Sequence, residues 1–367
     1  MKSSRERMPD KFILFWDQRL VQALGGSPWL AAVIVATFMF ASFYLLALST
    51  GVYELIDDGY ISDVALTFGL DPYTWAAFVT SLLTGFGVSG SSWAVVHEER
   101  DLKQAAQVVA RDPDELAEDW LRFQKERVRR GLFFGATFYV VGFLVVLLTI
   151  PGAADLLRLK QGALLPWFQQ IPAGWFLVFV PINFAVIGKS GYFTISDERF
   201  MRDLRKTHLK IDLFHPENLA PFNRMALRRC FLWSVGSAIG LLFFLNEAIE
   251  ARGLAPFLFG IFVVAFATLF TPLTGMHRKI SAVKKQELSE VRTLIVQLKN
   301  QLMSDKASSA EIAQRLTGLI AYEGRLEKTP EWPIDLPTIG KFSLYLGIPV
   351  FSWVGGALME RLVDVLI

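Results

Sequence analysis

The sequence predicts an all-α, polytopic membrane protein with seven transmembrane helices and a cytoplasmic helical hairpin. Three observations predict this fold class. Hydrophobic residues make up 53% of the 367 residues and charged residues only 20%, whereas about a quarter of a soluble chain is charged. The apolar residues are concentrated in runs close to the length of helix that crosses a bilayer, about 20 residues. Lys and Arg are concentrated in alternate connections between these runs.

Seven apolar segments define the predicted spans. They are residues 29–49, 73–96, 131–150, 173–187, 230–245, 254–273 and 342–358. The fifth and seventh are short, and helix tilt or local thinning of the bilayer compensates for that. The segments divide the chain into an N-terminal amphipathic helix on the inner membrane surface (1–28), a six-helix membrane region (29–275), the hairpin (276–338), and the seventh span with its C-terminus (339–367). Within the membrane region, residues 97–130 and 190–229 are predicted to be cytoplasmic helical loops.

The distribution of Lys and Arg predicts the orientation. The N-terminal segment and the connections after the second, fourth and sixth spans carry five, eight, eight and ten of the 37 basic residues. The connections on the other side carry four. Because Lys and Arg are retained on the cytoplasmic side, we expect the N-terminus inside and the C-terminus outside. The expected location is the cell membrane, and specifically a bacterial inner membrane.

The segment 276–338 carries an apolar stripe on each of two predicted helices. In the first helix, apolar residues follow alternating steps of three and four, which is the spacing of a coiled coil. These residues are Leu288, Val291, Ile295, Leu298 and Leu302, and the second helix has Ile312, Leu316, Leu319 and Leu326. We expect the two helices to pair as a hairpin below the membrane. The alternative is a solvated, charged linker.

Several classes of chemistry lack a signature in this sequence. The single cysteine, Cys230, cannot form an intramolecular disulfide or a two-cysteine metal site. Residues 85–90 match GxGxxG, but they lie inside a predicted span with no preceding strand, so they do not predict dinucleotide binding. Instead, Ser81, Gly85 and Ser89 recur at every fourth position, which is typical of close helix packing. We therefore predict no catalytic residue, no cofactor, no metal site and no nucleic-acid partner, and we do not expect an enzyme.

Charged residues inside the predicted spans are scarce. Lys189 lies near the cytoplasmic end of the fourth span, where a lysine can extend its amine to the interface. The spans contain no chain of carboxylates or histidines that would serve as a proton relay. Lys189 is therefore interpreted as an interfacial residue.

Two groups of residues are candidate functional sites. The last span contains small residues that would leave backbone accessible to ions or water if they lined a pore, or would pack against a neighbouring helix. The pore-lining candidates are Ser352, Gly355 and Gly356, with Glu360 at the outer mouth. The first outer loop has five acidic residues and no basic one, and these would concentrate cations at a mouth or be ordinary acidic loop residues. They are Glu54, Asp57, Asp58, Asp63 and Asp71.

The C-terminal segment from Glu331 to Glu360 has a distinctive pattern. It reads Trp-Pro-x-Asp, followed by Pro-x-x-Ser-Trp-x-Gly-Gly-Ala-Leu. In this it resembles a family of uncharacterised bacterial polytopic membrane proteins, which implies a multi-pass protein and no particular activity. In topology alone, the chain is similar to the seven-helix channel superfamily of insect odorant and gustatory receptors. That similarity implies a pore-lining last helix, although the aromatic signature of their last helix is absent here.

Three functional hypotheses follow from these features. The first is an oligomeric ion channel that assembles through its cytoplasmic helices and is lined by the last span. The second is a non-conducting membrane scaffold or signalling protein whose hairpin recruits a soluble cytoplasmic partner. The third is a secondary transporter, which the lack of an internal repeat disfavours. The expected partners are the lipid bilayer, further copies of the chain and, for the scaffold, the soluble protein.

Overall fold

The computed structural model describes residues 16–51, 70–109, 112–149, 153, 171–208, 211–246, 254–304, 309–332 and 336–366. Across these residues every element of regular secondary structure is a helix, which confirms the all-α class. The α-helices are α1 (Trp16–Ala23), α2 (Pro28–Ser49), α4 (Pro72–Val108), α5 (Pro113–Thr149), α7 (Ile171–His208), α8 (Ala220–Leu241), α9 (Leu254–Ser304), α10 (Ser309–Lys328) and α11 (Leu336–Leu366). Two short 3-10 helices, η3 (Pro216–Leu219) and η4 (Leu242–Leu245), flank α8.

Five helical segments are long and apolar enough to cross a membrane. They are Pro28–Ser49, Asp114–Leu148, Pro172–Leu204, Ala220–Leu245 and Pro337–Met359. Five of the seven predicted spans fall in these segments. The other two, residues 73–96 and 254–273, are helical within α4 and α9 but are not among the five. The described helices therefore support a multi-pass membrane protein with five such segments.

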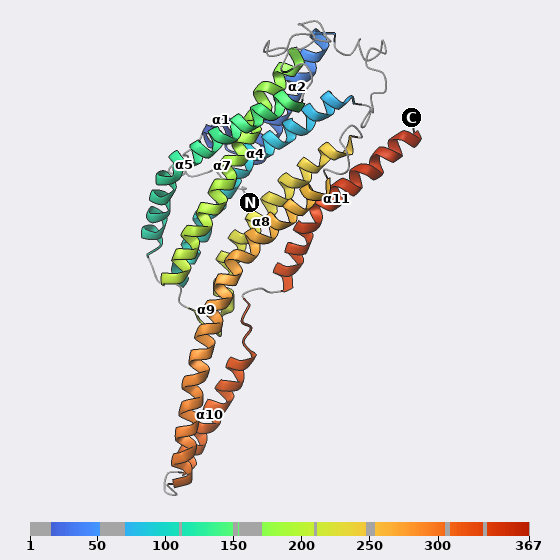
Figure 1. Ribbon diagram of the computed structural model, residues 1–367. Coiled ribbons are helices and arrows are strands. Elements are labelled where there is room, and N and C mark those ends of the chain that lie inside the picture. Colours follow the sequence, from blue (N-terminus) through green and yellow to red (C-terminus); the bar gives the residue numbers. More distant parts are fainter. Residues whose placement is uncertain are drawn as a thin grey trace, which may run out of the picture.

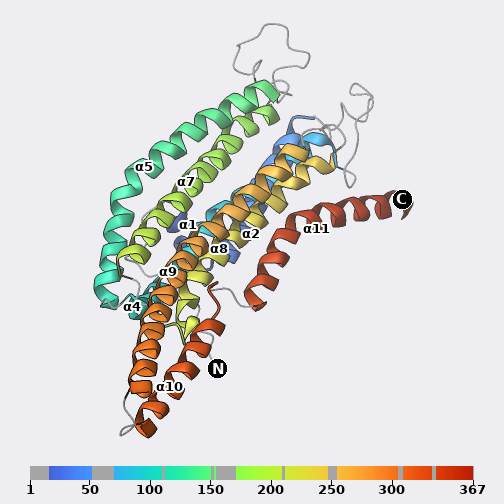
Figure 2. The ribbon, with the colours of Figure 1, turned by 60° about the horizontal axis from the view of Figure 1, so that its bottom comes forward.

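The helices pack as a bundle from which one hairpin extends (Figure 1). Helix α5 lies along α7, α2 lies along α4, and α8 packs against both α9 and α11. Helix α4 joins the two sides because its backbone lies close to both α7 and α8, whereas the backbones of α7 and α8 hardly approach each other. Figure 2 shows α10 folding back along the second half of α9, away from the other helices. We call the end of the bundle next to this hairpin the hairpin end.

Helix α9 crosses the predicted boundary between the membrane region and the hairpin. That boundary was placed between residues 275 and 276, but α9 is one helix of 51 residues from Leu254 to Ser304. Pro272 lies inside it, and a proline in a helix removes one backbone hydrogen bond without necessarily ending the helix. The two regions therefore share a continuous helix instead of being joined by a loop.

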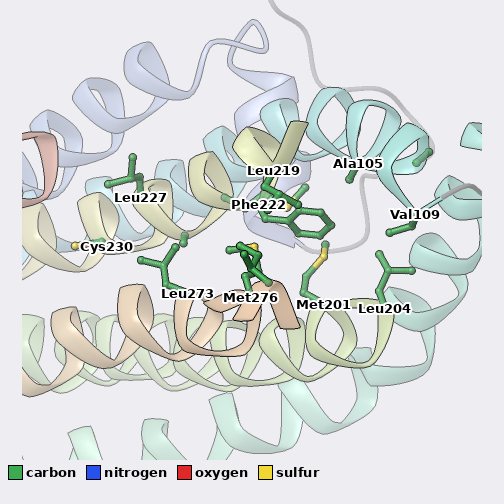
Figure 3. Close-up of a cluster of buried hydrophobic side chains, with 14 of the residues drawn as sticks. Ala105, Val109, Met201, Leu204, Leu219, Phe222, Leu227, Cys230, Leu273 and Met276 are labelled. Carbon is green, nitrogen blue, oxygen red and sulfur yellow. The ribbon is translucent and has the colours of Figure 1, made fainter. Parts of the chain in front are cut away.

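A large hydrophobic core fills the hairpin end of the bundle (Figure 3). It brings together Phe222 of α8, Met201 of α7, Met276 of α9 and Val109 at the end of α4, all of them buried. Burying apolar side chains of this size contributes about 1.5–3 kcal/mol each. This core fixes the four helices relative to one another at the end where the charged residues described below are found.

The connection between α1 and α2 is a tight turn. Gly25 has a φ of 97° and Gly26 a φ of 77°, which is left-handed backbone that glycine adopts without strain. Ser27 then caps α2, since its hydroxyl oxygen accepts from the backbone N–H of Leu30 at 3.5 Å. The turn places the short helix α1 against α4, where Val21 packs in a small cluster with Ala31 and Val88.

Candidate functional site

A cavity of about 660 Å³ lies between α4, α7 and α8, in the space where α7 and α8 do not meet. Residues of α5 and η4 and one residue of α1 complete its wall. Along α4 the lining runs from Ala76 to Ala94, a rise of about 27 Å at 1.5 Å per residue. The hydrocarbon core of a bilayer is about 30 Å thick. The cavity therefore extends over most of the length of a membrane-spanning helix.

Apolar side chains form most of the wall. Leucine, valine and aromatic residues of three helices face the cavity, and small residues keep it open between them. The large apolar residues of the wall include Leu83, Phe86, Val180, Phe184, Leu232 and Phe243. Where α4 approaches α7, a Cβ added at Gly87 would lie only 2.8 Å from Cγ1 of Val186. Where α4 approaches α8, a Cβ at Gly236 would lie 3.3 Å from Cε1 of Phe86.

At the hairpin end the wall becomes polar and charged. The lining there comprises Gln18, Gln124, Arg127, Lys189, Asp197 and Arg229. Arg127 of α5 pairs with Asp197 of α7, donates to the Ser196 hydroxyl at 2.7 Å, and lies over the Phe193 ring at 4.7 Å. Arg229 of α8 lies 3.5 Å from the other oxygen of Asp197 and 3.7 Å from Glu198. These ion pairs join α5, α7 and α8 across one end of the cavity.

A second ion pair fastens α1 to the same end. The amine of Lys189 on α7 donates to Oδ2 of Asp17 on α1 at 2.5 Å. Both side chains are buried, with exposed fractions of 5% for Lys189 and 0% for Asp17. Removing one partner of a buried pair leaves an uncompensated charge and costs about 3–5 kcal/mol. The Lys189 amine therefore does not extend into solvent, because it meets a carboxylate inside the protein.

The chemistry of this site is that of binding. Among the described residues, no group of three or more His, Cys, Asp or Glu is placed to hold a metal ion. A long apolar cavity that ends in a few convergent charged groups matches the composition of ligand pockets, whose polar groups orient the ligand. Its volume is within the common range of about 300–1,000 Å³ for such pockets. The shape and polarity suit a molecule with a hydrocarbon tail and a polar head.

The predicted pore-lining residues lie elsewhere. Gly355 faces outward, with no atom near an added Cβ, whereas a Cβ at Gly356 would lie 2.6 Å from Cδ1 of Leu245 in η4. Ser352 is half-buried, and Glu360 is part of α11. Gly356 thus packs within the chain and Gly355 does not, and Ser352, Gly355 and Gly356 are not among the residues that line the cavity between α4, α7 and α8.

The predicted acidic loop is described only at its last residue. Asp71 is buried and caps α4, since its Oδ1 accepts from the backbone N–H groups of Tyr73 at 2.9 Å and Thr74 at 3.1 Å. That carboxylate therefore stabilises a helix start. Glu54, Asp57, Asp58 and Asp63 lie outside the described residues.

Close packing at the small residues of α4 is visible in the structure. A Cβ at Gly85 would lie 2.5 Å from the carbonyl oxygen of Ala32 and 3.1 Å from Cβ of Ala36, so α2 approaches α4 at this glycine. Ser81 and Ser89 are also buried. The glycine motif at 85–90 thus lies between helices.

The cavity and its charged end are not predicted by the sequence patterns described above. One available signal was Asn183, a polar residue in the middle of the fourth predicted span that lines the cavity. Another was the placement of Arg127 and Asp197 within a few residues of apolar segments. No protein-family model matches this chain, and no curated protein or solved structure matches it either.

Proposed function

We propose that this chain is a multi-pass membrane protein that binds an amphipathic, lipid-like molecule in the cavity between α4, α7 and α8. One observation carries the proposal: a single cavity about 27 Å long is apolar along most of its wall and charged at one end. A hydrocarbon tail would gain about 25 cal/mol for each Å² of apolar surface removed from water. The charged end would hold the polar head.

The polarity of the wall favours this ligand over an ion in transit. Ion pathways are lined by backbone carbonyls or by rings of charged side chains along their length. Here the charged residues are confined to one end, while Leu83, Val180 and Leu232 face the middle of the cavity. A dry, apolar passage of that kind opposes hydrated ions and accepts hydrocarbon.

We further propose the seven-span topology, with the N-terminus inside and the C-terminus outside a cell membrane. The segregation of Lys and Arg supports it. In this topology α4 and the first half of α9 are the two additional spans. The charged end of the cavity then lies at the cytoplasmic surface, which is where a lipid of the inner leaflet has its headgroup.

Filling the cavity tests the proposal. Ser237 on α8 lines the cavity, so Ser237→Phe places a bulky ring in it and Ser237→Ala leaves it open. The full chain, purified in detergent, is titrated with diacylglycerol and with phospholipids of the same chain length, and bound lipid is counted by native mass spectrometry. We expect wild type and Ser237→Ala to retain lipid, and Ser237→Phe to lose at least tenfold in affinity. Equal binding by all three proteins would place the lipid on the outer surface and refute the proposal.

An oligomeric channel lined by α11 remains a second proposed function. The observation in its favour is that only 6% of the apolar segment Pro337–Met359 is buried, against 22–39% of the other four segments. Although α11 packs against α8 on one side, the rest of its surface is uncovered and is available to a second copy. Large apolar side chains on that surface include Phe351, Val354 and Leu358.

A scaffold role would use the hairpin of α9 and α10. Its exposed apolar side chains include Val296, Met303 and Ile320, and exposed apolar surface of sufficient area marks an interaction site. Capture of one soluble protein through residues 276–338, abolished by Val296→Glu, would support this function. Unchanged capture by that variant would count against it.

A further inference from the structure

We infer that the charged end of the cavity receives an anionic headgroup, carrying a phosphate or a carboxylate, and that this headgroup competes with Asp17 for Lys189. The inference rests on the proposed binding of a lipid-like molecule and specifies its chemical class. The ligand is taken as a membrane lipid, because only a tail would fill the apolar length of the cavity.

The first argument is the charge of the wall. Among the described residues that line the cavity, three are cationic, Arg127, Lys189 and Arg229, and one is acidic, Asp197. The carboxylates of Asp17 and Glu198 pair with these cations from positions outside the lining, so the charges are balanced while the pairs are intact. A headgroup that displaces a carboxylate therefore finds a cation in the wall, and phosphate and carboxylate form strong, charge-assisted hydrogen bonds with such groups.

The second argument is the difference between the cations. Arg127 is held by Asp197, by the Ser196 hydroxyl and by the faces of Trp120 and Phe123 at 5.3 and 5.0 Å, so its position is fixed. Lys189 is held by a carboxylate from another helix. A lysine amine is a compact charge with three donors, so one anion can replace another at it without a change of geometry.

The third argument is the attachment of α1. The helix has only eight residues, begins with an exposed Trp16, and is joined to α2 through the left-handed Gly25 and Gly26. Asp197 and Glu198, by contrast, are part of the 38-residue helix α7. Moving Asp17 away from Lys189 therefore requires a rotation of α1 about its glycine turn and the separation of Val21 from Ala31 and Val88, and the long helices keep their places. Asp17 is the anion that a headgroup can displace at the lowest cost.

These contacts define an exchange that conserves charge. The headgroup oxygen takes the place of Oδ2 of Asp17 at the Lys189 amine, and the Asp17 carboxylate moves into water. Gln18, the next residue of α1, leaves the cavity wall with it. Occupation by an anionic lipid is in this way coupled to release of α1, whereas a lipid without a charged head leaves α1 in place.

Native mass spectrometry of the full chain tests the inference with four probes of matched composition. These are phosphatidylglycerol, phosphatidylcholine and diacylglycerol with identical acyl chains, and glycerol phosphate as a headgroup without a tail. We expect wild type to bind phosphatidylglycerol at least tenfold more tightly than diacylglycerol. Lys189→Gln should lose that preference and Asp17→Asn should increase it, because the competing carboxylate is gone. Asp101→Asn is the matched control, since Asp101 is a buried carboxylate that pairs with Arg224 and Arg228 outside the cavity.

The outcomes separate the inference from the proposed function. Equal binding of all three lipids, abolished by Ser237→Phe, would leave the proposed function intact and overturn the inference. If wild type binds none of the lipids, both the inference and the proposed function are overturned. If wild type binds glycerol phosphate tightly and binds no lipid, the site belongs to a soluble anion. If Lys189→Gln does not fold, Asp17→Asn still tests the inference. An unchanged preference for phosphatidylglycerol in Asp17→Asn would show that the headgroup does not compete with Asp17 for Lys189. Hydrogen exchange of residues 16–23 should quicken with phosphatidylglycerol and not with diacylglycerol.

Discussion

The amine of Lys284 on α9 lies 2.9 Å from the carbonyl oxygen of Glu327, near the end of α10. It also donates to the carbonyl oxygen of Thr329 at 2.8 Å, and it is buried. The last carbonyls of a helix have no partner within the helix. Lys284 therefore caps α10 from across the hairpin and fixes where the chain leaves it.

Replacing this lysine should loosen the hairpin. Lys284→Met removes two hydrogen bonds from a charged donor, each worth about 1.5–3 kcal/mol. The carbonyl oxygens of Glu327 and Thr329 then lose this donor. We expect amide hydrogens of residues 322–332 to exchange at least tenfold faster. Lys285→Met is the control, because Lys285 is exposed on the same turn. Equal exchange in the two variants would show that the cap contributes nothing to stability.

Gly85→Ala should separate α2 from α4. The new Cβ would lie 2.5 Å from the backbone oxygen of Ala32, so one helix must move, at a cost of about 1–3 kcal/mol. Gly191→Ala has no atom within 4 Å of the added Cβ, and it should be neutral or stabilising by up to about 1 kcal/mol. Thermal unfolding in detergent compares them. A Gly85→Ala protein as stable as Gly191→Ala would contradict the close approach.

The two glycines of α11 distinguish packing within the chain from assembly. Gly356→Leu meets Leu245 and should lower the unfolding temperature without altering the oligomeric state. Gly355→Leu enters open space in the single chain, so it should change only contacts with a second copy. Particle mass in detergent and conductance in a planar bilayer are measured for both. An unaltered mass and conductance in Gly355→Leu would remove the support for a channel lined by this face.

Labelling of single cysteines tests the proposed topology. The natural Cys230 is fully buried, so an introduced cysteine should report with little background. We expect Asp58→Cys to react with a membrane-impermeant maleimide added to intact cells, and Gln286→Cys to react only after the cells are opened. The reverse pattern would invert the orientation, and labelling of both from outside would refute the seven-span arrangement.

Much of the fold could be predicted because it depends on local pattern. Within the described residues all seven predicted spans are helical, since a run of apolar residues with few helix breakers has little alternative in a membrane. The pairing of α9 with α10 followed from two apolar stripes; the structure adds the bridge from Arg292 to Glu323 and Glu327, at 2.6 and 2.7 Å. The continuity of α9 across residue 275 was not predicted, because the change from an apolar to a charged composition there does not show whether the helix continues.

The candidate site could not be predicted, because it depends on which helix faces meet. Lys189 and Asp17 are 172 residues apart, so no spacing rule connects them. The cavity exists where α7 and α8 diverge along α4, and Gly87 and Gly236 set that separation through close approaches to other helices. The sequence does not distinguish these two glycines, which line the cavity, from Gly85, which lies at a close contact between α2 and α4.

Because α9 is one continuous helix, a bend within it displaces the whole hairpin. The part of α9 beyond Pro272 rises over 32 residues to Ser304, about 48 Å. Pro272 lacks one backbone hydrogen bond, so it is the point at which the helix bends most readily. A bend of about 10° there, with the core around Met276 moving along with it, would carry the hairpin tip about 8 Å, a distance set by the length of a rigid helix. A small rearrangement among the packed helices would thus produce a larger displacement at the hairpin tip.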